Sequence, residues 1–295
     1  MTAAAVCWCR HAGDRADGPP YVRGKRILEA VLGHLQTTHG MAAATDLIIT
    51  GGSSGGHATY LNCDRAAGLQ KAANGSTRVS CLADAGFFLK HPSISGAATT
   101  TPQFEESFYA WNSSGAVNQD CLAHYTAIGT PEQCIFAEKV LPFIKTPLFV
   151  AQNLYDSWQL NNILKVTTGG CGGYGKDMSK CSPAQMAAVQ AYGADMRSLL
   201  AAGLKPNHGI FAPSCIAHCQ TTENEHPASL WDWPGRWSIG SDNATPMQVF
   251  NAWYAATHGV EEQLVVVGAS AAPTQLVQQC NWSSTACNTK CPLYT

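Results

Sequence analysis

The segment LIITGGSSGGHATYLNCD, residues 47–64, holds a serine in a setting that suits nucleophilic catalysis. Its stretch Gly51-Gly52-Ser53-Ser54-Gly55 matches G-x-S-x-G, in which a strand turns sharply into a helix and small flanking residues let the backbone pass close by. An apolar run precedes the motif and a helical pattern follows it, as such a turn requires. Ser53 is therefore the candidate nucleophile. The backbone N–H of Ser54, the next residue, is the candidate donor to the oxyanion of acyl transfer.

Two other interpretations of this turn stay open. It could be a plain glycine-rich connection, or a phosphate-binding loop, because backbone N–H groups at a helix N-terminus also bind anions. A phosphate loop of the Walker type has a lysine after its last glycine, whereas this chain has His57 there.

A serine hydroxyl needs a base to take its proton, and a histidine base needs a carboxylate to orient it. The predicted strand TPLFVAQN runs into LYDSWQL, which places Asp156 in the loop after that strand. The next predicted strand, HGIFAPS, runs into CIAHCQ, which places His218 in the equivalent loop. The chain order Ser, Asp, His is the order found in α/β-hydrolases. The sequence therefore predicts a triad of Ser53, Asp156 and His218.

The remaining histidines and the carboxylate also have simpler interpretations. His57 and His208 have no comparable place after a strand, and a single histidine is more often a satisfied polar residue than a catalyst. Asp156 could instead be an acidic residue at a helix N-terminus, where the helix dipole favours it.

These side chains require a parallel sheet to bring them together. Short apolar runs without alternation, separated by helical patterns, are typical of buried parallel strands. We expect strands at 46–50, 78–86, 146–153 and 208–214, and helices at 24–39, after the first strand, from Ser182 and from Thr245. The alternation predicts an α/β fold with a mostly parallel central sheet flanked by helices.

The expected organisation is one catalytic domain. Residues 1–20 are expected to form an irregular N-terminal segment, and residues 21–295 a single α/β-hydrolase-like domain. The stretches 91–145 and 221–244 are rich in Ser, Thr, Trp, Pro and Asn. We expect loops or small helical insertions there, lying over one face of the sheet.

Composition excludes several classes of function. The formal net charge is −2 and no run of Lys and Arg occurs, so no surface for nucleic acid is expected. No stretch of about 18 apolar residues offers a membrane span. Acyl transfer by a triad needs neither a cofactor nor a metal, and we expect none. The expected partner is an ester substrate with an uncharged reacting group.

Thirteen cysteines point to a secreted or luminal protein, because structural disulfides are rare in the cytosol. Four Asn-x-Ser/Thr sites, at Asn74, Asn112, Asn243 and Asn281, favour the same compartment. The first twenty residues lack the apolar region of a signal peptide. Either the export signal is missing or these residues are not the natural start.

The cysteine spacing predicts disulfides that pin short loops. Cys121 with Cys134 and Cys171 with Cys181 close loops outside the core strands, and Cys63 with Cys81 would tie the helix after the serine to the next strand. The pairing of the others stays open. Zinc binding is the competing interpretation for three close cysteine pairs: Cys7 and Cys9, Cys215 and Cys219, Cys287 and Cys291. None of these pairs has the C-x₂-C spacing that is common in structural zinc sites.

Five spaced blocks, in order, resemble the signature blocks of the pectin acetylesterase and Notum family of carboxylesterases: GGSSGGHATYLNCD, CLADAGFF, KTPLFVAQNLYDSWQLNNIL, CSPAQM and FAPSCIAHCQT. The similarity runs from about Tyr21 to Cys291. It implies an α/β-hydrolase fold and the triad Ser53, Asp156 and His218. The forms YDSWQ and HCQ are closer to the plant-type pectin acetylesterases, which implies removal of acetyl groups from a polysaccharide.

The chain departs from the family in one respect. Family members carry an early core strand ending in a glycine-rich block with Trp and Cys, which supplies a second oxyanion donor. That block is not found here, so the resemblance implies a chain without the family's N-terminal part. Loss of one oxyanion donor costs about 10²–10³ in rate. Two alternatives therefore stand beside the acetylesterase: a Notum-like deacylase of a lipid-modified protein, and a catalytically impaired relative that only binds.

Overall fold

The structure, a computed structural model, describes residues 4–5, 22–171, 178–220, 244–259 and 275–277. In this part of the chain, strands pair in parallel in the order β1-β2-β3-β4-β5-β6. Their bounds are Ala4–Ala5, Asp46–Gly52, Arg78–Asp84, Leu148–Ala151, Gly209–Ala212 and Gln275–Val277. Because all run the same way, their carboxyl ends meet at one edge of the sheet.

The predicted α/β architecture is confirmed: β3 to β5 fall within the segments expected to be strands, and β2 begins as expected but runs to Gly52 rather than ending at Thr50. Two short strands were not expected. β1 lies in the N-terminal segment, so residues 1–20 are not irregular throughout, and β6 lies beyond the last predicted helix. Strands of two and three residues are too short to leave a periodic pattern in a sequence.

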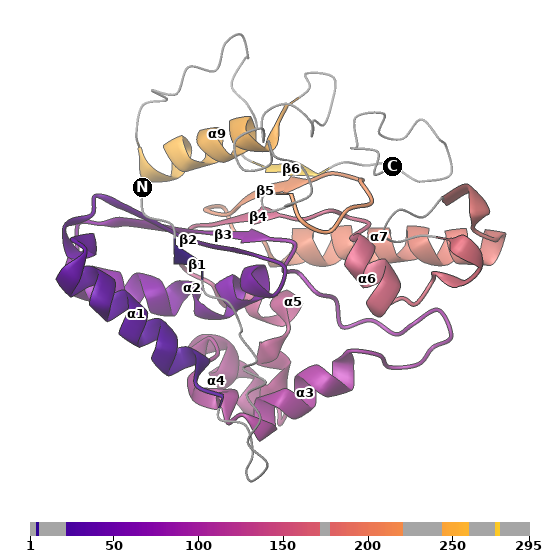
Figure 1. The fold of residues 1–295 in the computed structure, drawn as a ribbon, viewed down its shortest axis with the longest axis horizontal. Helices are drawn as coiled ribbons and strands as arrows, with labels where there is room; N and C mark the ends of the chain where they lie inside the picture. The colour runs from indigo at the N-terminus through magenta and orange to yellow at the C-terminus, as the bar shows by residue number, and fades with distance from the viewer. Residues whose placement is uncertain (1–3, 6–21, 172–177, 221–243, 260–274, 278–295) are drawn as a thin grey trace.

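Helices cover both faces of the sheet (Figure 1). Their bounds are α1 Gly24–Thr38, α2 Ser54–Ala73, α3 Thr101–Ala110, α4 Gln119–Ala127, α5 Ala137–Val140, α6 Ser157–Asn162, α7 Pro183–Gly203 and α9 Pro246–His258. Short 3₁₀ helices lie at Met41–Ala43, Ser113–Gly115, Pro131–Ile135, Leu141–Phe143, Thr168–Gly170 and Met178–Lys180. In Figure 1, α9 lies above the sheet, while α1, α2 and α5 lie below it.

Helix starts follow from local sequence. Ser182 caps α7 and Thr245 caps α9, each by accepting a hydrogen bond from the backbone N–H of a glutamine three residues on, whose side chain bonds back. A proline follows each cap, where a missing N–H costs nothing. The predicted helix starts at Ser182 and Thr245 are confirmed. The stretch 91–145 contains the short helices α3, α4 and α5, as expected. Residues 221–243 of the second such stretch lie outside the described residues.

Alternate strand residues point into two separate apolar clusters, one on each face. Leu148 and Val150 of β4 belong to the larger cluster, and Phe149 belongs to the smaller one with Val249 and Trp253 of α9. This division follows the two-residue period of a strand, and both faces are apolar because both are covered. The larger cluster joins β2 to β5 with α1, α2, α5 and α7.

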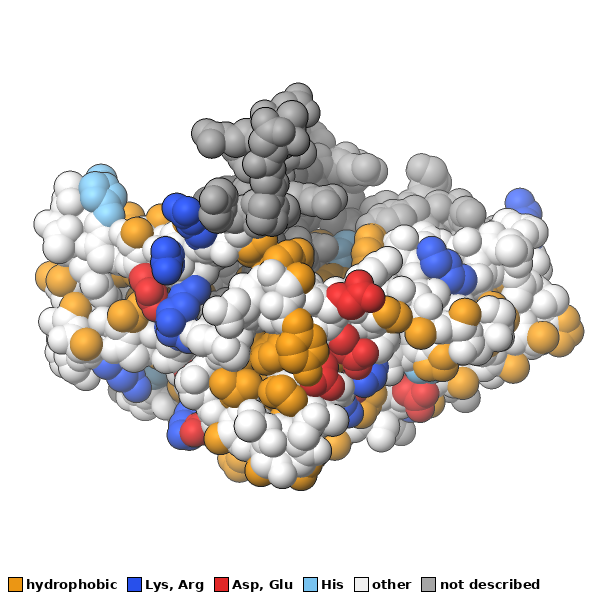
Figure 2. All heavy atoms as spheres, turned by 90° about the horizontal axis from the view of Figure 1, so that it is seen from below, with side chains coloured by type: hydrophobic (Ala, Val, Ile, Leu, Met, Phe, Trp, Pro, Cys, Tyr) orange, Lys and Arg blue, Asp and Glu red, His pale blue; other side chains and the backbone are white. Residues whose placement is uncertain are grey.

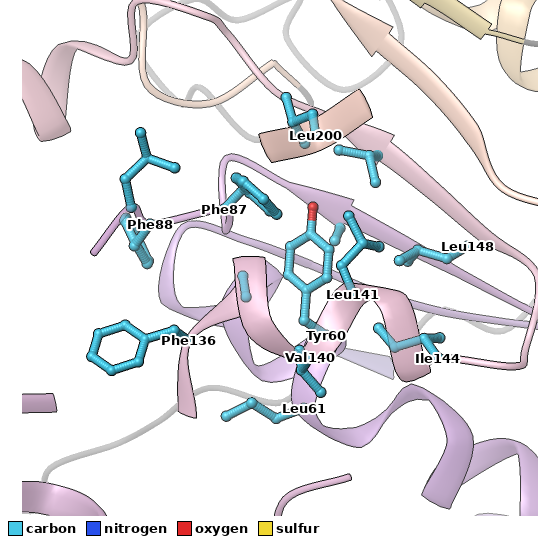
Figure 3. Packing of buried hydrophobic residues seen from close by; sticks show 14 of the residues in the cluster. Tyr60, Leu61, Phe87, Phe88, Phe136, Val140, Leu141, Ile144, Leu148 and Leu200 are labelled. Carbon is cyan, nitrogen blue, oxygen red and sulfur yellow. The ribbon is translucent and has the colours of Figure 1, made fainter. Parts of the chain in front are cut away.

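The larger cluster surrounds the helix that follows the candidate nucleophile. Tyr60 of α2 is 1% exposed, and its ring centroid lies 5.8 Å from that of Phe87. Figure 3 shows Tyr60 near the middle of this packing with Leu141 beside it, and Phe88 and Phe136 at one side. The start of α2 therefore rests on a closely packed core.

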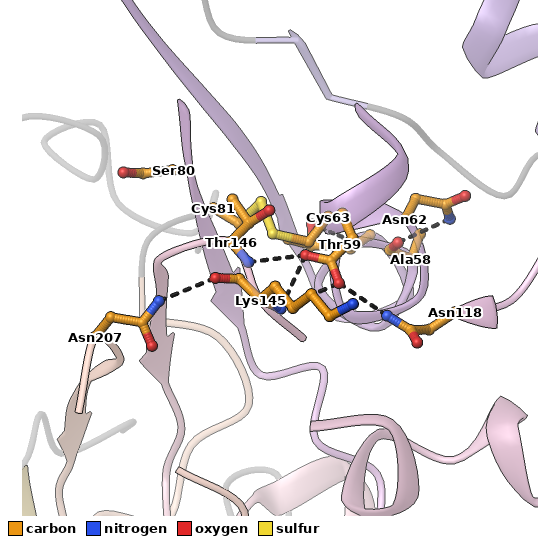
Figure 4. The surroundings of a disulfide bond; sticks show 12 residues. Ala58, Thr59, Asn62, Cys63, Ser80, Cys81, Asn118, Lys145, Thr146 and Asn207 are labelled. Atoms are coloured by element: carbon orange, nitrogen blue, oxygen red, sulfur yellow. Dashed lines mark hydrogen bonds between the residues drawn. A yellow bond between two sulfur atoms is a disulfide. The ribbon is translucent and has the colours of Figure 1, made fainter. Parts of the chain in front are cut away.

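Disulfides reinforce the same region. Cys63–Cys81, Cys121–Cys134 and Cys171–Cys181 are bonded, which confirms the three predicted pairs. The first joins α2 to β3. Beside it, the Asp64 carboxylate accepts hydrogen bonds from the backbone of Lys145 and Thr146 and from the Asn118 amide (Figure 4).

Charged side chains of both signs share the surface, in agreement with the small net charge of the sequence. On the face drawn in Figure 2, Lys and Arg side chains are interspersed with Asp and Glu. Among the helices that the structure describes, none combines the length and the apolar character needed to cross a membrane.

Candidate active site

Ser53 occupies a strained turn between β2 and α2. Its φ of 57° and ψ of −122° lie in a region that non-glycine residues rarely adopt, and its N–H donates to the Asp84 carbonyl at 2.9 Å. The neighbouring glycines make this turn possible. A Cβ on Gly51 would lie 2.5 Å from the carbonyl carbon of Gly55, and one on Gly56 would lie 2.2 Å from the Asp84 oxygen. The local sequence therefore holds the serine at a tight elbow, as the motif predicts.

The structure brings together all three residues predicted to act as a triad. His218 Nε2 lies 2.6 Å from Ser53 Oγ. His218 Nδ1 lies 3.0 and 2.9 Å from the two carboxylate oxygens of Asp156. This is the geometry in which a histidine can take the serine proton while a carboxylate fixes its tautomer.

Asp156 is fully buried and is held in place by two groups besides His218. It is the N-cap of α6, where its Oδ1 accepts from the backbone N–H of Gln159 at 3.0 Å. Its Oδ2 accepts from the Gln152 amide at 3.3 Å. Both interpretations of this carboxylate hold at once, because it caps a helix and also faces His218.

The loops that carry Asp156 and His218 run side by side at the edge of the sheet. Leu154 N–H donates to the Pro213 carbonyl at 2.9 Å, and Ser157 N–H donates to the Ala217 carbonyl at 3.3 Å. His218 is 6% exposed. Adjacent parallel strands thus deliver the acid and the base to one place, where α/β sheets carry their sites.

Asp84 links the serine turn to the histidine loop, a role that the sequence did not reveal. Its carbonyl receives the Ser53 N–H, and its buried carboxylate accepts from the Gln220 backbone N–H at 3.1 and 3.0 Å. The one available signal was a carboxylate at the carboxyl end of a buried strand, in the block CLADAGFF.

His57 and His208 face other groups. His57 Nε2 lies 2.6 Å from the Ile135 carbonyl, and burial lowers the pKa of this imidazole to about 4. His208 Nδ1 accepts from the Lys205 N–H, and burial likewise lowers the pKa of His208 to about 4. Both are neutral at pH 7, and His57 donates its proton to the backbone rather than accepting one from a substrate.

Ser54 is the first residue of α2, so its N–H belongs to the orphan donors of a helix N-terminus. Its side chain is exposed.

Within the described ranges, no group of three or more His, Cys, Asp or Glu is arranged to hold a metal ion. Of the three close cysteine pairs, Cys7 with Cys9 and Cys287 with Cys291 lie outside those ranges. Cys215 of the third pair is disulfide-bonded, so its sulfur is not a free zinc ligand.

A parallel sheet with helices on both faces, with a serine at the turn after one strand and an aspartate and histidine after two later strands, defines the α/β-hydrolase class. The structure of the Wnt deacylase Notum from Drosophila is similar in fold, with a TM-score of 0.66 and 24% identity, over 91% of this chain and 65% of that one. The chain belongs to the pectinacetylesterase family, whose model matches residues 11–292.

Individual relatives include plant and animal members. Pectin acetylesterase 7 of Arabidopsis thaliana is 34% identical over 206 residues, which cover 68% of this chain and 50% of that protein. Palmitoleoyl-protein carboxylesterase NOTUM of Homo sapiens is 27% identical over 281 residues, or 91% of this chain and 50% of that protein. The chain thus spans about half the length of these relatives.

Proposed function

We propose that this chain is a secreted serine carboxylesterase that removes acetyl groups from a polysaccharide such as pectin. The observation that carries the proposal is the continuous relay from Ser53 through His218 to the buried Asp156. Membership of the pectinacetylesterase family supports the ester chemistry, and higher identity to the plant pectin acetylesterase than to human NOTUM supports the acetyl group.

In the proposed reaction, His218 Nε2 takes the Ser53 proton as Oγ attacks the acetyl carbonyl carbon. The negative charge that forms on the carbonyl oxygen is stabilised by the Ser54 N–H. The imidazolium then gives its proton to the sugar oxygen as the C–O bond breaks, which leaves an acetyl-serine. Water, deprotonated by His218, attacks this ester, and acetate leaves with Ser53 reprotonated. Throughout, the Asp156 carboxylate accepts a hydrogen bond from His218 Nδ1–H, which fixes the tautomer and stabilises the imidazolium.

Secretion is supported by the three described disulfides, which persist in oxidising compartments. Two of the four glycosylation sites lie in the described residues, and Asn112 is exposed there. Treatment of the exported protein with a deglycosidase and a non-reducing peptide map would check both features.

The activity is tested by acetate release from p-nitrophenyl acetate and from acetylated pectin, with Ser53→Ala as the control. We expect release by the wild type and none above background by the variant. If wild-type protein with its disulfides formed releases no acetate but still binds pectin, the impaired binding relative is the correct function. Release from a palmitoleoylated peptide, without release from either acetyl ester, would favour the Notum-like deacylase.

A further inference from the structure

Two aromatic rings stand directly beside the candidate base. The Trp158 ring is nearly parallel to the His218 ring, with an interplanar angle of 28° and centroids 6.1 Å apart. The Phe88 ring centroid lies 6.2 Å from that of His218 and 5.1 Å from that of Trp158. Trp158 is half-buried and Phe88 is buried. The Ser–His pair therefore has an aromatic wall on this side.

The wall continues without a break into the helices below it. The Phe88 ring contacts His57 at 5.8 Å and Phe104 of α3 at 6.4 Å, between centroids. Phe104 in turn packs on Phe136 at 5.7 Å. In Figure 3, Phe88 and Phe136 lie at one side of the core, away from Leu141 and Leu148. Rings in contact therefore occupy this side of the site from His218 to Phe136.

The backbone on both sides of Phe88 is fixed by two buried glutamines. Phe87 N–H donates to the Gln152 side chain at 3.1 Å, and the Gln159 amide donates to the Phe87 carbonyl at 3.1 Å. Leu89 N–H donates to the Gln159 oxygen at 3.1 Å. Both glutamines also bond Asp156. The wall is therefore tied to the triad and cannot withdraw without disturbing it.

We propose that Trp158, supported by Phe88 and Phe104, limits the acyl group of the substrate to short chains such as acetyl. This inference rests on the proposed esterase function and names the class of ester that the site accepts. An acetyl group carries only a methyl beyond its carbonyl carbon. Each further methylene on this side must displace a ring from a packed cluster, and overpacking of that kind costs more free energy than is gained by burying one methylene.

The first test is the chain-length profile of the wild type on p-nitrophenyl acetate, butyrate and octanoate. We expect kcat/KM to fall at least about tenfold from acetate to octanoate, since one methylene in a confined pocket already changes kcat/KM by about tenfold or more. Equal or rising values with chain length overturn the inference but leave the esterase function intact. No hydrolysis of any ester overturns both.

The second test removes the wall. In Trp158→Ala and, independently, in Phe104→Ala, the octanoate-to-acetate ratio of kcat/KM should rise at least about tenfold. Phe143→Ala is the matched control, because this half-buried ring packs on His124 and Tyr125 of α4 instead, and it should keep the wild-type ratio. Phe104→Ala keeps the test decisive if Trp158→Ala fails to fold.

Other outcomes contradict the proposal directly. If the folded variants lose activity equally on all three esters, Trp158 only positions His218. If Trp158→Ala raises KM for acetylated pectin and leaves the octanoate-to-acetate ratio unchanged, the indole binds the sugar rather than limiting the acyl group.

Discussion

Ser53 and Ser54 are adjacent, yet the proposed mechanism uses the side chain of the first and only the backbone of the second. Ser53→Ala should reduce esterase activity by about 10³-fold or more, because the nucleophile is lost. Ser54→Ala keeps the N–H and should retain most activity. Rates of p-nitrophenyl acetate hydrolysis by the two variants check this. If Ser54→Ala loses activity and Ser53→Ala keeps it, the nucleophile is Ser54 and the G-x-S-x-G assignment is wrong.

Asp156 has two roles that one substitution can separate. An asparagine can still cap α6 through its side-chain oxygen, so Asp156→Asn should unfold at nearly the wild-type temperature. It can also turn an amide donor toward His218 Nδ1, which favours the wrong tautomer, and kcat should fall by about 10⁴. Thermal unfolding and kinetics of the same preparation test both parts. Near-normal kcat would exclude Asp156 as the orienting group.

The elbow depends on how closely α2 approaches β3. In Gly56→Ala the new Cβ would meet the Asp84 carbonyl, which is backbone and cannot rotate away. We expect a loss of stability of about 1–3 kcal/mol or more, with loss of activity, because Ser53 and Asp84 must move apart.

Gly68 in the same helix gives the matched control. It is exposed, and a Cβ there would meet nothing within 4 Å. Gly68→Ala should therefore stabilise the protein by up to about 1 kcal/mol through helix propensity. Urea unfolding of both variants measures the contrast. A Gly56→Ala protein as stable as Gly68→Ala would show that the close approach is not required.

The sequence predicted these elements to different degrees. The elbow is a local motif, and the order of Asp156 and His218 after successive apolar strands is readable because parallel strands end at one edge. The contact between Asp84 and Gln220 joins residues 136 positions apart and leaves no local pattern. The same holds for Gln152 and Gln159, whose side chains bond the backbone around Phe87 across 65 and 72 residues.

Two buried neutral histidines make the stability of the whole domain depend on pH. The pKa of His57 falls from 6.5 to about 4 on folding, so the unfolded chain binds more protons between these values. The contribution of His57 to the free energy of unfolding is fully present above about pH 6.5 and is lost as the pH falls toward 4. His208 acts in the same direction. We expect the free energy of unfolding to drop by up to about 3 kcal/mol per histidine between pH 7 and pH 4.

His57→Gln isolates one of these contributions. Glutamine has no group that titrates here and can donate to the Ile135 carbonyl as His57 does. Urea unfolding at pH 7, 5.5 and 4 should show a smaller loss for the variant than for the wild type, by up to about 3 kcal/mol. If the free energy of unfolding falls by the same amount in the two proteins over this pH range, His57 is not held neutral.

In the proposed mechanism, His218 and Asp156 make Ser53 a nucleophile. Incubation with a fluorophosphonate, followed by intact mass measurement and peptide mapping, tests this without any assumption about the substrate. We predict one adduct per chain, on Ser53, absent in Ser53→Ala and formed far more slowly in Asp156→Asn. An adduct on Ser54, or labelling of Ser53 at the same rate in Asp156→Asn, would contradict the account.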